Sequence, residues 1–302
     1  MPANEHELTE KERDDIYTRK IYRGYFKSSV TDLSPSFHLL AGQPGAGKTA
    51  LRDHIKDEMK ESPPIVINTD DLREFHPHYN ELLQSSILAT VIATPKLVNA
   101  DSGYWFKRLL NDALSMRRSI ILDTTLGGAT DSFSKTIENV RNLGYSLHLN
   151  VLAVRKEVST LGIYLRFLKQ IENKGFGRMV SIKDTHDINY KNLAPNITYL
   201  LSLPQAQYFN SVSVFKKSVF EQSGVIVNNS VESIFSTPST GAVENLSLVI
   251  ETERNRNFTP VERAYYQNKM AEVERLIQQL RPELITDFQN DTKALNRLIF
   301  PR

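Results

Sequence analysis

Residues 39–51 read LLAGQPGAGKTAL, and this stretch decides which fold the rest of the chain must build. Within it, residues 42–49 fit the pattern Gly, four residues, Gly-Lys-Thr. An apolar run at 36–42 precedes the pattern, and a helix-like stretch at 49–61 follows it. A strand, a glycine-rich turn and a helix in this order predict a phosphate-binding loop.

The glycines of such a loop let the backbone turn so that successive N–H groups point inward, where the N-terminus of the next helix adds partial positive charge. Lys48 is expected to reach the β- and γ-phosphates of ATP, and Thr49 to offer its hydroxyl to Mg²⁺. The residues predicted to bind this cofactor are Gly42, Gln43, Pro44, Gly45, Ala46, Gly47, Lys48, Thr49 and Ala50.

Further apolar runs predict buried strands at PIVINTD (64–70), SIILDTT (119–125) and SLHLNVLAV (146–154). Helix-like segments lie between or after them, at 96–117, 130–143, 156–173 and 185–202. This alternation predicts an α/β fold of the P-loop NTPase or kinase-like type, with three αβα layers and a mostly parallel central sheet.

The two ends of the chain have their own signals. Thr9 and Glu12 have capping-box spacing and predict a helix over about 10–27, whereas 211–229 has the pattern of a hairpin at the sheet edge. The stretch STPSTGAVEN (236–245) is a break, and the following LSLVIETER fits strand and helix equally well.

Thr259, Pro260 and Glu262 then predict the start of a helix that continues to about Arg281, with a last helix at about 285–299. The resulting division is a kinase-like domain at 1–235, a linker at 236–258 and a helical C-terminal extension at 259–302. An apolar stripe on the first of these helices favours packing against the domain. Its members are Tyr266, Met270, Val273, Ile277 and Leu280.

Composition excludes several classes of function. The formal net charge of the 302 residues is only +2, so no global field favours nucleic acid or an anionic membrane. The absence of cysteine removes disulfides, thiolate nucleophiles and cysteine-ligated metals. No signal-peptide core and no run near the roughly twenty apolar residues of a membrane span are present, so a soluble cytoplasmic protein is expected.

Carboxylates follow two of the predicted strands. Asp70 and Asp71 end the second strand, at the sheet edge where α/β proteins bind ligands, and one of them can take the proton of an attacking hydroxyl. The alternative for this pair is a helix N-cap. Asp123 ends the third strand, where an acidic residue orders the water shell of Mg²⁺ in many NTPases. A regulatory GTPase is disfavoured because no Asn/Thr-Lys-x-Asp motif is present.

Five stretches in this order resemble the zeta toxin family, the kinases of bacterial toxin–antitoxin systems that phosphorylate UDP-N-acetylglucosamine. They are GQPGAGKTALR, INTDDLREFHPHY, IILDTT, VLAVRKEVSTLGIYLRF and GRMVSIKDTHDINYKNL. The resemblance covers about residues 36–203 and continues more weakly to about 230. The first motif is shared with many NTPases, but the ordered set is much more specific.

The resemblance implies roles for individual residues. Asp70 is the general base for the 3′-hydroxyl of the amino sugar, Lys48 and Thr49 serve phosphate and Mg²⁺, and Arg166 and Arg178 contact the γ-phosphate. Guanidinium groups there stabilise the charge that develops during phosphoryl transfer. The product is expected to impair cell-wall synthesis by depleting its precursors.

The same resemblance places Asp123 and Thr125 at the sugar nucleotide, so Asp123 has two competing roles, with metal or with substrate. Family members carry glutamate where this chain has Asp123, which shortens the reach by one methylene. The helix NADSGYWFKRLLNDA (99–113) is implied to help bind the sugar, with Asp101 and Trp105 as candidates.

Two histidine motifs favour structural roles: His76-Pro77 as a turn, and His186 with Asp187 at a helix start. The resemblance implies an antitoxin partner whose helix obstructs the nucleotide site. We therefore also consider the hypothesis that the tail beyond residue 240 or the N-terminal helix blocks that site in cis. No metal-ligand spacing supports a zinc site.

Two other functions stay open at this stage. A P-loop kinase can act on a different small hydroxyl-bearing acceptor, since related cores differ mainly in the acceptor pocket. Alternatively, ATP binding without transfer can regulate a binding protein, which has no need for Asp70.

Overall fold

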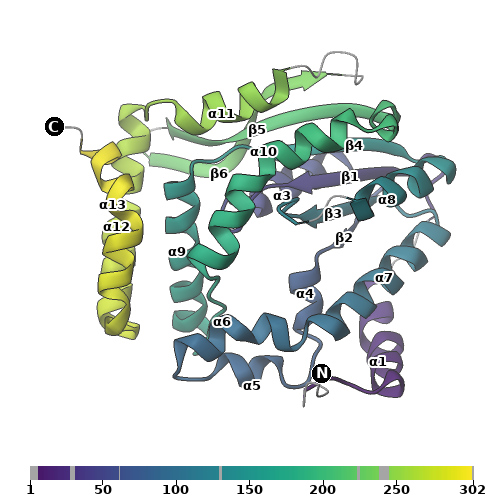
Figure 1. Cartoon of the computed structure of the whole chain (residues 1–302), viewed down its shortest axis with the longest axis horizontal. Coiled ribbons are helices and arrows are strands. Elements are labelled where there is room, and N and C mark those ends of the chain that lie inside the picture. Colours follow the sequence, from purple (N-terminus) through teal and green to yellow (C-terminus); the bar gives the residue numbers. More distant parts are fainter. Residues whose placement is uncertain are drawn as a thin grey trace.

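The computed structural model of the chain describes residues 6–27, 31–60, 62–128, 131–222, 225–237 and 245–300. Its centre is one six-stranded sheet of order β2-β3-β1-β4-β5-β6, in which only β6 runs antiparallel to its neighbour (Figure 1). The strands are β1 (Ser36–Ala41), β2 (Ile65–Ile67), β3 (Ile120–Thr124), β4 (Ser146–Leu152), β5 (Phe209–Gln222) and β6 (Val225–Thr237). The predicted parallel sheet and edge hairpin are confirmed, while the hairpin tip lies outside the described residues.

Alternation along the central strands explains why both faces of the sheet are covered. Leu39 and Ile120 belong to one apolar cluster, whereas their neighbours Leu40 and Ile121 belong to a second cluster on the opposite face. All four are at most 1% exposed. Because successive side chains of a strand point to opposite faces, continuous apolar strands require helices on both sides.

The N-terminal helices, α7, α8, α10 and α11 contribute to the first cluster, and α3, α9, α12 and α13 contribute to the second. The main helices are α1 (Glu10–Ile16), α2 (Arg23–Phe26), α3 (Lys48–Glu58), α4 (Thr69–Arg73), α5 (Tyr79–Leu83), α6 (Leu88–Leu97), α7 (Asn99–Ser115), α8 (Asp131–Asn142), α9 (Lys156–Lys174), α10 (Asp187–Ser202), α11 (Leu246–Asn255), α12 (Pro260–Leu280) and α13 (Ile285–Ile299). In the described ranges, no helix combines the length and apolar character needed to cross a membrane.

The predicted N-terminal helix is confirmed, with a π-helical middle over Tyr17–Tyr22 that joins α1 to α2. Its capping box forms as expected: the Thr9 N–H donates to Glu12 Oε2 at 2.9 Å, and the Glu12 N–H donates to Thr9 Oγ1. The helix packs against α7, where the Tyr17 hydroxyl donates to Asp112 at 2.5 Å.

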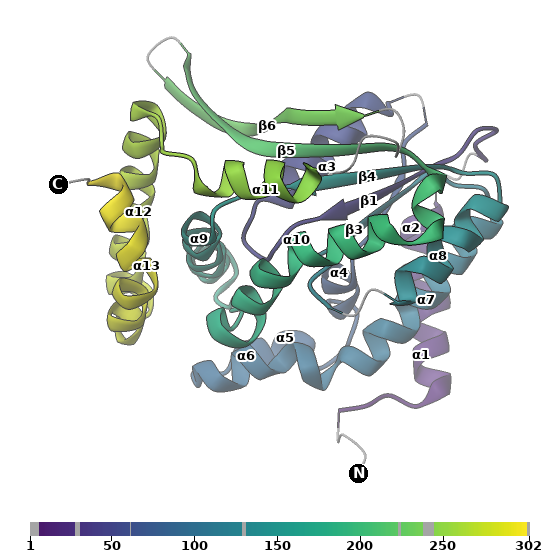
Figure 2. The same cartoon turned by 45° about the horizontal axis from the view of Figure 1, so that its top comes forward.

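The region expected as a linker, 236–258, contains helix α11, which lies beside β5 (Figure 2). Leu246 and Ile250 of this helix are almost fully buried in the first cluster, and this burial settles the ambiguous LSLVIETER pattern as helix. Most of the predicted break at 236–245 lies outside the described residues. The division into domains therefore stays a prediction, but the chain is anchored to the sheet before the C-terminal helices begin.

The start of α12 is confirmed: Thr259 caps it, Pro260 occupies the first turn and Glu262 completes a capping box. The predicted apolar stripe packs against α9, with Val273 and Ile277 fully buried in the second cluster. Helix α13 contacts both, so the three helices pack against one another, with α12 and α13 at the outer end of the molecule (Figure 1).

Candidate active site

The glycine-rich loop between β1 and α3 is packed directly onto α9. Gly45 and Gly47 have φ values of 77° and 90°, a region that glycine adopts without steric cost. A Cβ at Gly45 would lie only 2.1 Å from the carbonyl oxygen of Ser159. Both the backbone conformation and the close approach of α9 therefore require glycine at position 45.

The side chain of Gln43 fixes the glycine-rich loop through hydrogen bonds to residues outside the loop. It is fully buried, and its Nε2 donates to the carbonyl of Val154 at 2.8 Å and to Ser159 Oγ at 3.2 Å. Its Oε1 accepts a hydrogen bond at 3.3 Å from Arg254 of α11. The motif treats position 43 as variable, so this role of Gln43 in fixing the loop could not be predicted from the motif.

His186 and Asp187 lie at the start of α10, as expected, but the expected side-chain cap is absent and they contact α9 instead. The buried His186 places Nε2 2.8 Å from Ser159 Oγ and Nδ1 2.9 Å from Asp187 Oδ1. Asp187 also forms an ion pair with Lys156 at 2.7 Å. These residues stabilise the start of α9 beneath the loop.

Lys48 begins α3 and turns toward β3. Its Nζ donates to the Gly42 carbonyl at 2.8 Å and lies 3.7 Å from Asp123 Oδ1. Asn68 donates to the other oxygen of Asp123 at 3.1 Å. Asp123 Oδ1 is buried and makes no hydrogen bond within the described residues, so it retains capacity for a further cationic partner.

Thr49 follows Lys48 in the first turn of α3 and is exposed to solvent. Asp123 Oδ1, which accepts no hydrogen bond from the described residues, and the hydroxyl of the exposed Thr49 are both hard oxygen ligands, the type that Mg²⁺ binds. The residues at this end of the sheet thus fit the implied ion. Assignment of Thr49 to the metal stays a prediction.

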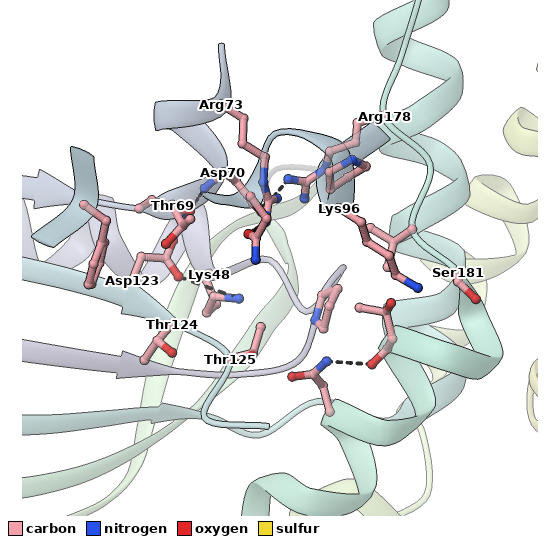
Figure 3. Close-up of a pocket in the computed structure, with 18 of the residues that line it drawn as sticks. Lys48, Thr69, Asp70, Arg73, Lys96, Asp123, Thr124, Thr125, Arg178 and Ser181 are labelled. Carbon is pink, nitrogen blue, oxygen red and sulfur yellow. Dashed lines mark hydrogen bonds and ion pairs between the residues drawn. The ribbon is translucent and has the colours of Figure 1, made fainter. Parts of the chain in front are cut away.

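Asp70 lies in the first turn of α4, immediately after β2. The expected alternative, that one of the paired aspartates caps the helix, is wrong because Asn68 is the N-cap: its Oδ1 accepts from the Asp70 N–H at 2.8 Å. Asp70 is instead paired with Arg178 at 2.6 Å and with Arg73 on its own helix (Figure 3).

The charge state of Asp70 follows from these neighbours. Burial favours a higher pKa for its carboxyl, but Arg178 and Arg73 outweigh burial and hold the pKa well below its usual range. Asp71 differs, because burial raises its pKa and it lines a separate cavity together with Arg52. Only Asp70 of the pair faces Lys48 and Arg178.

The two arginines singled out from the sequence come together beside Asp70. Arg166 lies on α9 and Arg178 on the segment that follows it, and burial together with the charge of Arg178 lowers the pKa of Arg166 to about 10. Nε and Nη2 of Arg166 are buried without a hydrogen-bond partner in the described parts of the chain. Arg166 therefore has N–H donors available for an anion, and the neighbouring positive charge of Arg178 favours an anion at this place.

A cavity of about 500 Å³ opens from Lys48 toward α6 and α7 (Figure 3). Lys48, Asp70, Asp123, Thr125 and Arg178 all line it. The cavity is also lined by Ile92, Pro95, Lys96, Asn99, Phe106, Phe133, Met179, Val180, Ser181, Thr185 and Asn189. The volume is that of a small-molecule site.

Asp101 and Trp105 do not line this cavity, contrary to the candidate role in sugar binding. Both are fully buried against the N-terminal segment: Asp101 pairs with Arg13 at 2.6 Å, and the Trp105 indole donates to the Arg13 carbonyl at 3.0 Å. His76 lies 3.2 Å from Asp101, and its Nε2 is 3.0 Å from the carbonyl of His6. These residues attach the N-terminal helix to α7, and the other face of α7 reaches the cavity.

Arg73 was not singled out from the sequence, although the i, i+3 spacing from Asp70 in DDLR is a usable signal for an ion pair on a short helix. Asn68 was also missed, despite the preference for asparagine at an N-cap.

Comparison with known proteins gives a consistent result. The model of the family described as Zeta toxin matches residues 22–222, more than half of the chain. Toxin zeta of Streptococcus agalactiae is 27% identical over 257 residues, covering 85% of this chain and 82% of the relative. Toxin PezT of Streptococcus pneumoniae is 27% identical over 196 residues, covering 65% of this chain and 74% of the relative.

Among solved structures, a chain from the PezAT chromosomal toxin–antitoxin system of Streptococcus pneumoniae superimposes with a TM-score of 0.70. It is 19% identical, and the match covers 90% of this chain and 98% of the other. This similarity concerns the fold, and it confirms the predicted kinase-like αβα class.

Proposed function

The chain belongs to the zeta toxin family, and from this membership we propose that it is a toxin kinase acting on UDP-N-acetylglucosamine or a related UDP-N-acetylhexosamine. It transfers the γ-phosphate of ATP to the 3′-hydroxyl of the amino sugar and thereby impairs cell-wall synthesis. The observation that carries the proposal is the shared cavity wall of Lys48, Asp70 and Arg178, which joins the phosphate-binding loop to a site for a second molecule. Both substrates are metabolites of the cytoplasm, where we place the enzyme.

The loop supplies the nucleotide site in this proposal. Its backbone N–H groups and the N-terminus of α3 receive the phosphates, and Lys48 exchanges its hydrogen bond with the Gly42 carbonyl for phosphate oxygens. Thr49 and Asp123 are the residues that would hold Mg²⁺, which neutralises charge on the β- and γ-phosphates when bound.

Asp70 acts as the general base. The acceptor oxygen forms a bond to the γ-phosphorus while the bond from that phosphorus to the β–γ bridging oxygen breaks, and the hydroxyl proton passes to a carboxylate oxygen of Asp70. The products are ADP and the phosphorylated sugar nucleotide. Thr125, which follows β3, is proposed to contact the acceptor inside the cavity, and Asp123 is the second acceptor contact only if Thr49 holds the metal without it.

The arginines stabilise the transferring group. Arg166 has unpaired donors and lies close to Arg178, which is paired with Asp70. When Arg178 turns toward the γ-phosphate, it weakens its ion pair with Asp70, which makes that carboxylate more basic at the moment it must accept a proton. The ion pair is therefore proposed to couple nucleotide binding to activation of the base.

The decisive experiment incubates the protein with ATP, Mg²⁺ and a panel of nucleotide sugars and other small alcohols, followed by mass spectrometry for an added phosphate and its position. Phosphorylated UDP-N-acetylhexosamine is the expected product. Asp70→Asn should abolish transfer while ATP still binds. Asp71→Asn is the matched control, because this adjacent carboxylate lines a different cavity and should leave transfer unchanged.

Other outcomes identify the alternatives. A different phosphorylated acceptor would keep the kinase and replace the substrate. A nucleotide-gated regulator would be favoured by two results together. The protein would bind ATP without transferring phosphate to any member of the panel, and Asp70→Asn would leave the cellular phenotype unaltered.

We also propose a protein antitoxin as partner, since one structural relative comes from a toxin–antitoxin system. The kinase activity can also be restrained by a segment of the same chain. Helix α11 is the candidate segment, because its Arg254 donates a hydrogen bond to Gln43 of the loop. Arg254→Ala tests the cis hypothesis: higher kinase activity would support it, and unchanged activity in a folded variant would leave restraint to the antitoxin alone.

A further inference from the structure

The hairpin β5–β6 extends well beyond the strand on which it is built. β4 pairs with β5 only as far as Phe215, whereas residues 216–222 continue with 225–232 as a two-stranded ribbon (Figure 2). The ribbon packs along α3, where the His54 ring contacts Phe215 at a centroid distance of 5.7 Å. It therefore lies beside the helix that begins at the phosphate-binding loop.

Lys217 projects from this ribbon to the loop itself. It is two residues from Phe215, so it shares the strand face that contacts α3. A Cβ at Gly47 would lie 3.5 Å from Cε and 3.6 Å from Nζ of Lys217. The ammonium group thus stands next to the backbone of the phosphate cradle.

Lys217 has no anionic partner among the described residues, whereas the adjacent Lys216, on the other face, pairs with Glu232 at 3.2 Å. The two acids nearest to Lys217 in a small adjoining cavity, Glu253 and Glu262, are both paired with Arg256. Burial, reinforced by the charge of Lys269, lowers the pKa of Lys217. A cation is therefore held, uncompensated, beside N–H groups and a helix N-terminus that are themselves electropositive.

Such an arrangement is unfavourable unless an anion completes it. We infer that Lys217 is a second phosphate-binding lysine, which contacts the polyphosphate of the nucleotide from the hairpin side of the loop. Lys48 approaches from the other side, because it turns to Asp123 on β3 while Lys217 comes from β5, and β1 lies between them. The inference rests on the nucleotide binding of the proposed function and adds a residue that no part of the loop motif identifies.

The test compares Lys217→Met with the matched control Lys216→Met, using calorimetric binding of ATP, ADP, AMP and adenosine. Loss of a charge-assisted contact predicts about 10- to 100-fold weaker ATP binding for Lys217→Met and little change for Lys216→Met. The affinity for adenosine should stay the same. The nucleotide with the fewest phosphates whose affinity falls in Lys217→Met identifies the phosphate that Lys217 contacts. Lys217→Arg should retain part of the affinity because it keeps the charge.

Equal weakening of adenosine and ATP would overturn the inference, because it would indicate a contact with the base or ribose. Unchanged ATP affinity in Lys217→Met would overturn it as well. Lys217→Gln serves as a second variant if the methionine variant does not fold, and thermal melting of each variant establishes which are native.

The wild-type protein separates this inference from the proposed function. If it binds no ATP and transfers no phosphate, the proposed function fails and the role of Lys217 fails with it. If it binds and transfers normally, and the Lys217 variants match it, only the second lysine is disproved.

Discussion

Asp70 and Arg178, which are 108 residues apart in sequence, are joined by an ion pair of 2.6 Å at the wall of the central cavity. Arg73 binds the same carboxylate from the same helix, and Arg166 lies close enough to interact electrostatically with Arg178 and Asp70, with unpaired donors. The proposed base is therefore surrounded by the cations that the transferring phosphate requires. This arrangement makes the ionisation of Asp70 and the position of Arg178 interdependent.

Removal of Arg178 should change both the rate and its pH dependence. With Arg178→Met, transition-state stabilisation is lost and kcat should fall by about 100- to 1,000-fold. The pKa of Asp70 should rise toward its usual range because a major cause of its depression is gone. The acidic limb of kcat/KM should therefore move to higher pH, and a rate profile extended down to about pH 3 should show a loss of activity in the variant that the wild type lacks. An unshifted limb would contradict the coupling of the two residues.

Arg166 should matter for turnover more than for folding. Because Nε and Nη2 have no partner in the described chain, Arg166→Ala removes no hydrogen bond of those atoms, and it should lower kcat by about 100-fold. Arg166→Lys should restore little, since an ammonium cannot reproduce the forked geometry of guanidinium. Steady-state kinetics beside thermal melting test this, and full activity of either variant would remove Arg166 from the site.

Gly45→Ala should disable the loop through a steric clash. The new Cβ would meet the carbonyl oxygen of Ser159 at 2.1 Å, so the loop or α9 must shift, and a displacement near 1 Å can lower kcat/KM by about 100-fold. The matched control is Gly144→Ala: Gly144 has a φ of 79° but open space around it. That variant should lose only about 1 kcal/mol of stability and no ATP affinity. Similar behaviour of the two variants would refute the packing argument.

Asp101 should contribute to stability and not to catalysis. Asp101→Ala leaves Arg13 and His76 without their buried partner, and the free energy of unfolding should fall by about 3 kcal/mol. Asp15→Ala, which removes an exposed ion pair of 3.7 Å with Arg19, should change it by less than about 0.5 kcal/mol. Urea unfolding measures both. A raised KM for the acceptor in a fully stable Asp101→Ala would restore the sugar-binding role.

Buried histidines should make the protein less stable as pH falls. Burial, with a smaller contribution from the stacked His148, lowers the pKa of His38 to about 3 from an ordinary value near 6.5. Between these values the unfolded chain binds a proton that the folded protein excludes, so unfolding becomes more favourable by about 1.4 kcal/mol per pH unit. This stability is fully present above about pH 6.5 and is lost progressively below it.

Urea unfolding at pH 7.5 and 5.5 measures this effect, and His38→Gln should reduce the difference between the two values. His54→Gln is the control because 40% of that side chain is exposed. His76, His148 and His186 also have pKa values lowered chiefly by burial, so part of the pH dependence should persist in His38→Gln. A wild-type protein equally stable at both pH values would contradict the prediction.

The sequence predicted the fold where its signals are local. The strand, glycine-rich turn and helix at 36–58, the capping boxes at Thr9 and Thr259 and the alternating apolar runs each depend on residues a few positions apart. Backbone turns, caps and strand burial are governed by such neighbours, which is why these elements were confirmed. The LSLVIETER segment had no decisive period, and only the burial of Leu246 and Ile250 against the sheet made it a helix.

The sequence by itself determined a glycine-rich loop between a strand and a helix, the order of the strands along the chain and the identity of the charged residues available at their ends. The tertiary structure decided which of those charges meet: Arg178 reaches Asp70, Asp101 turns to Arg13, and Lys217 arrives at Gly47 from a hairpin 170 residues away. Electrostatic energy depends on separation in space and on local burial, and neither is fixed by position in the sequence.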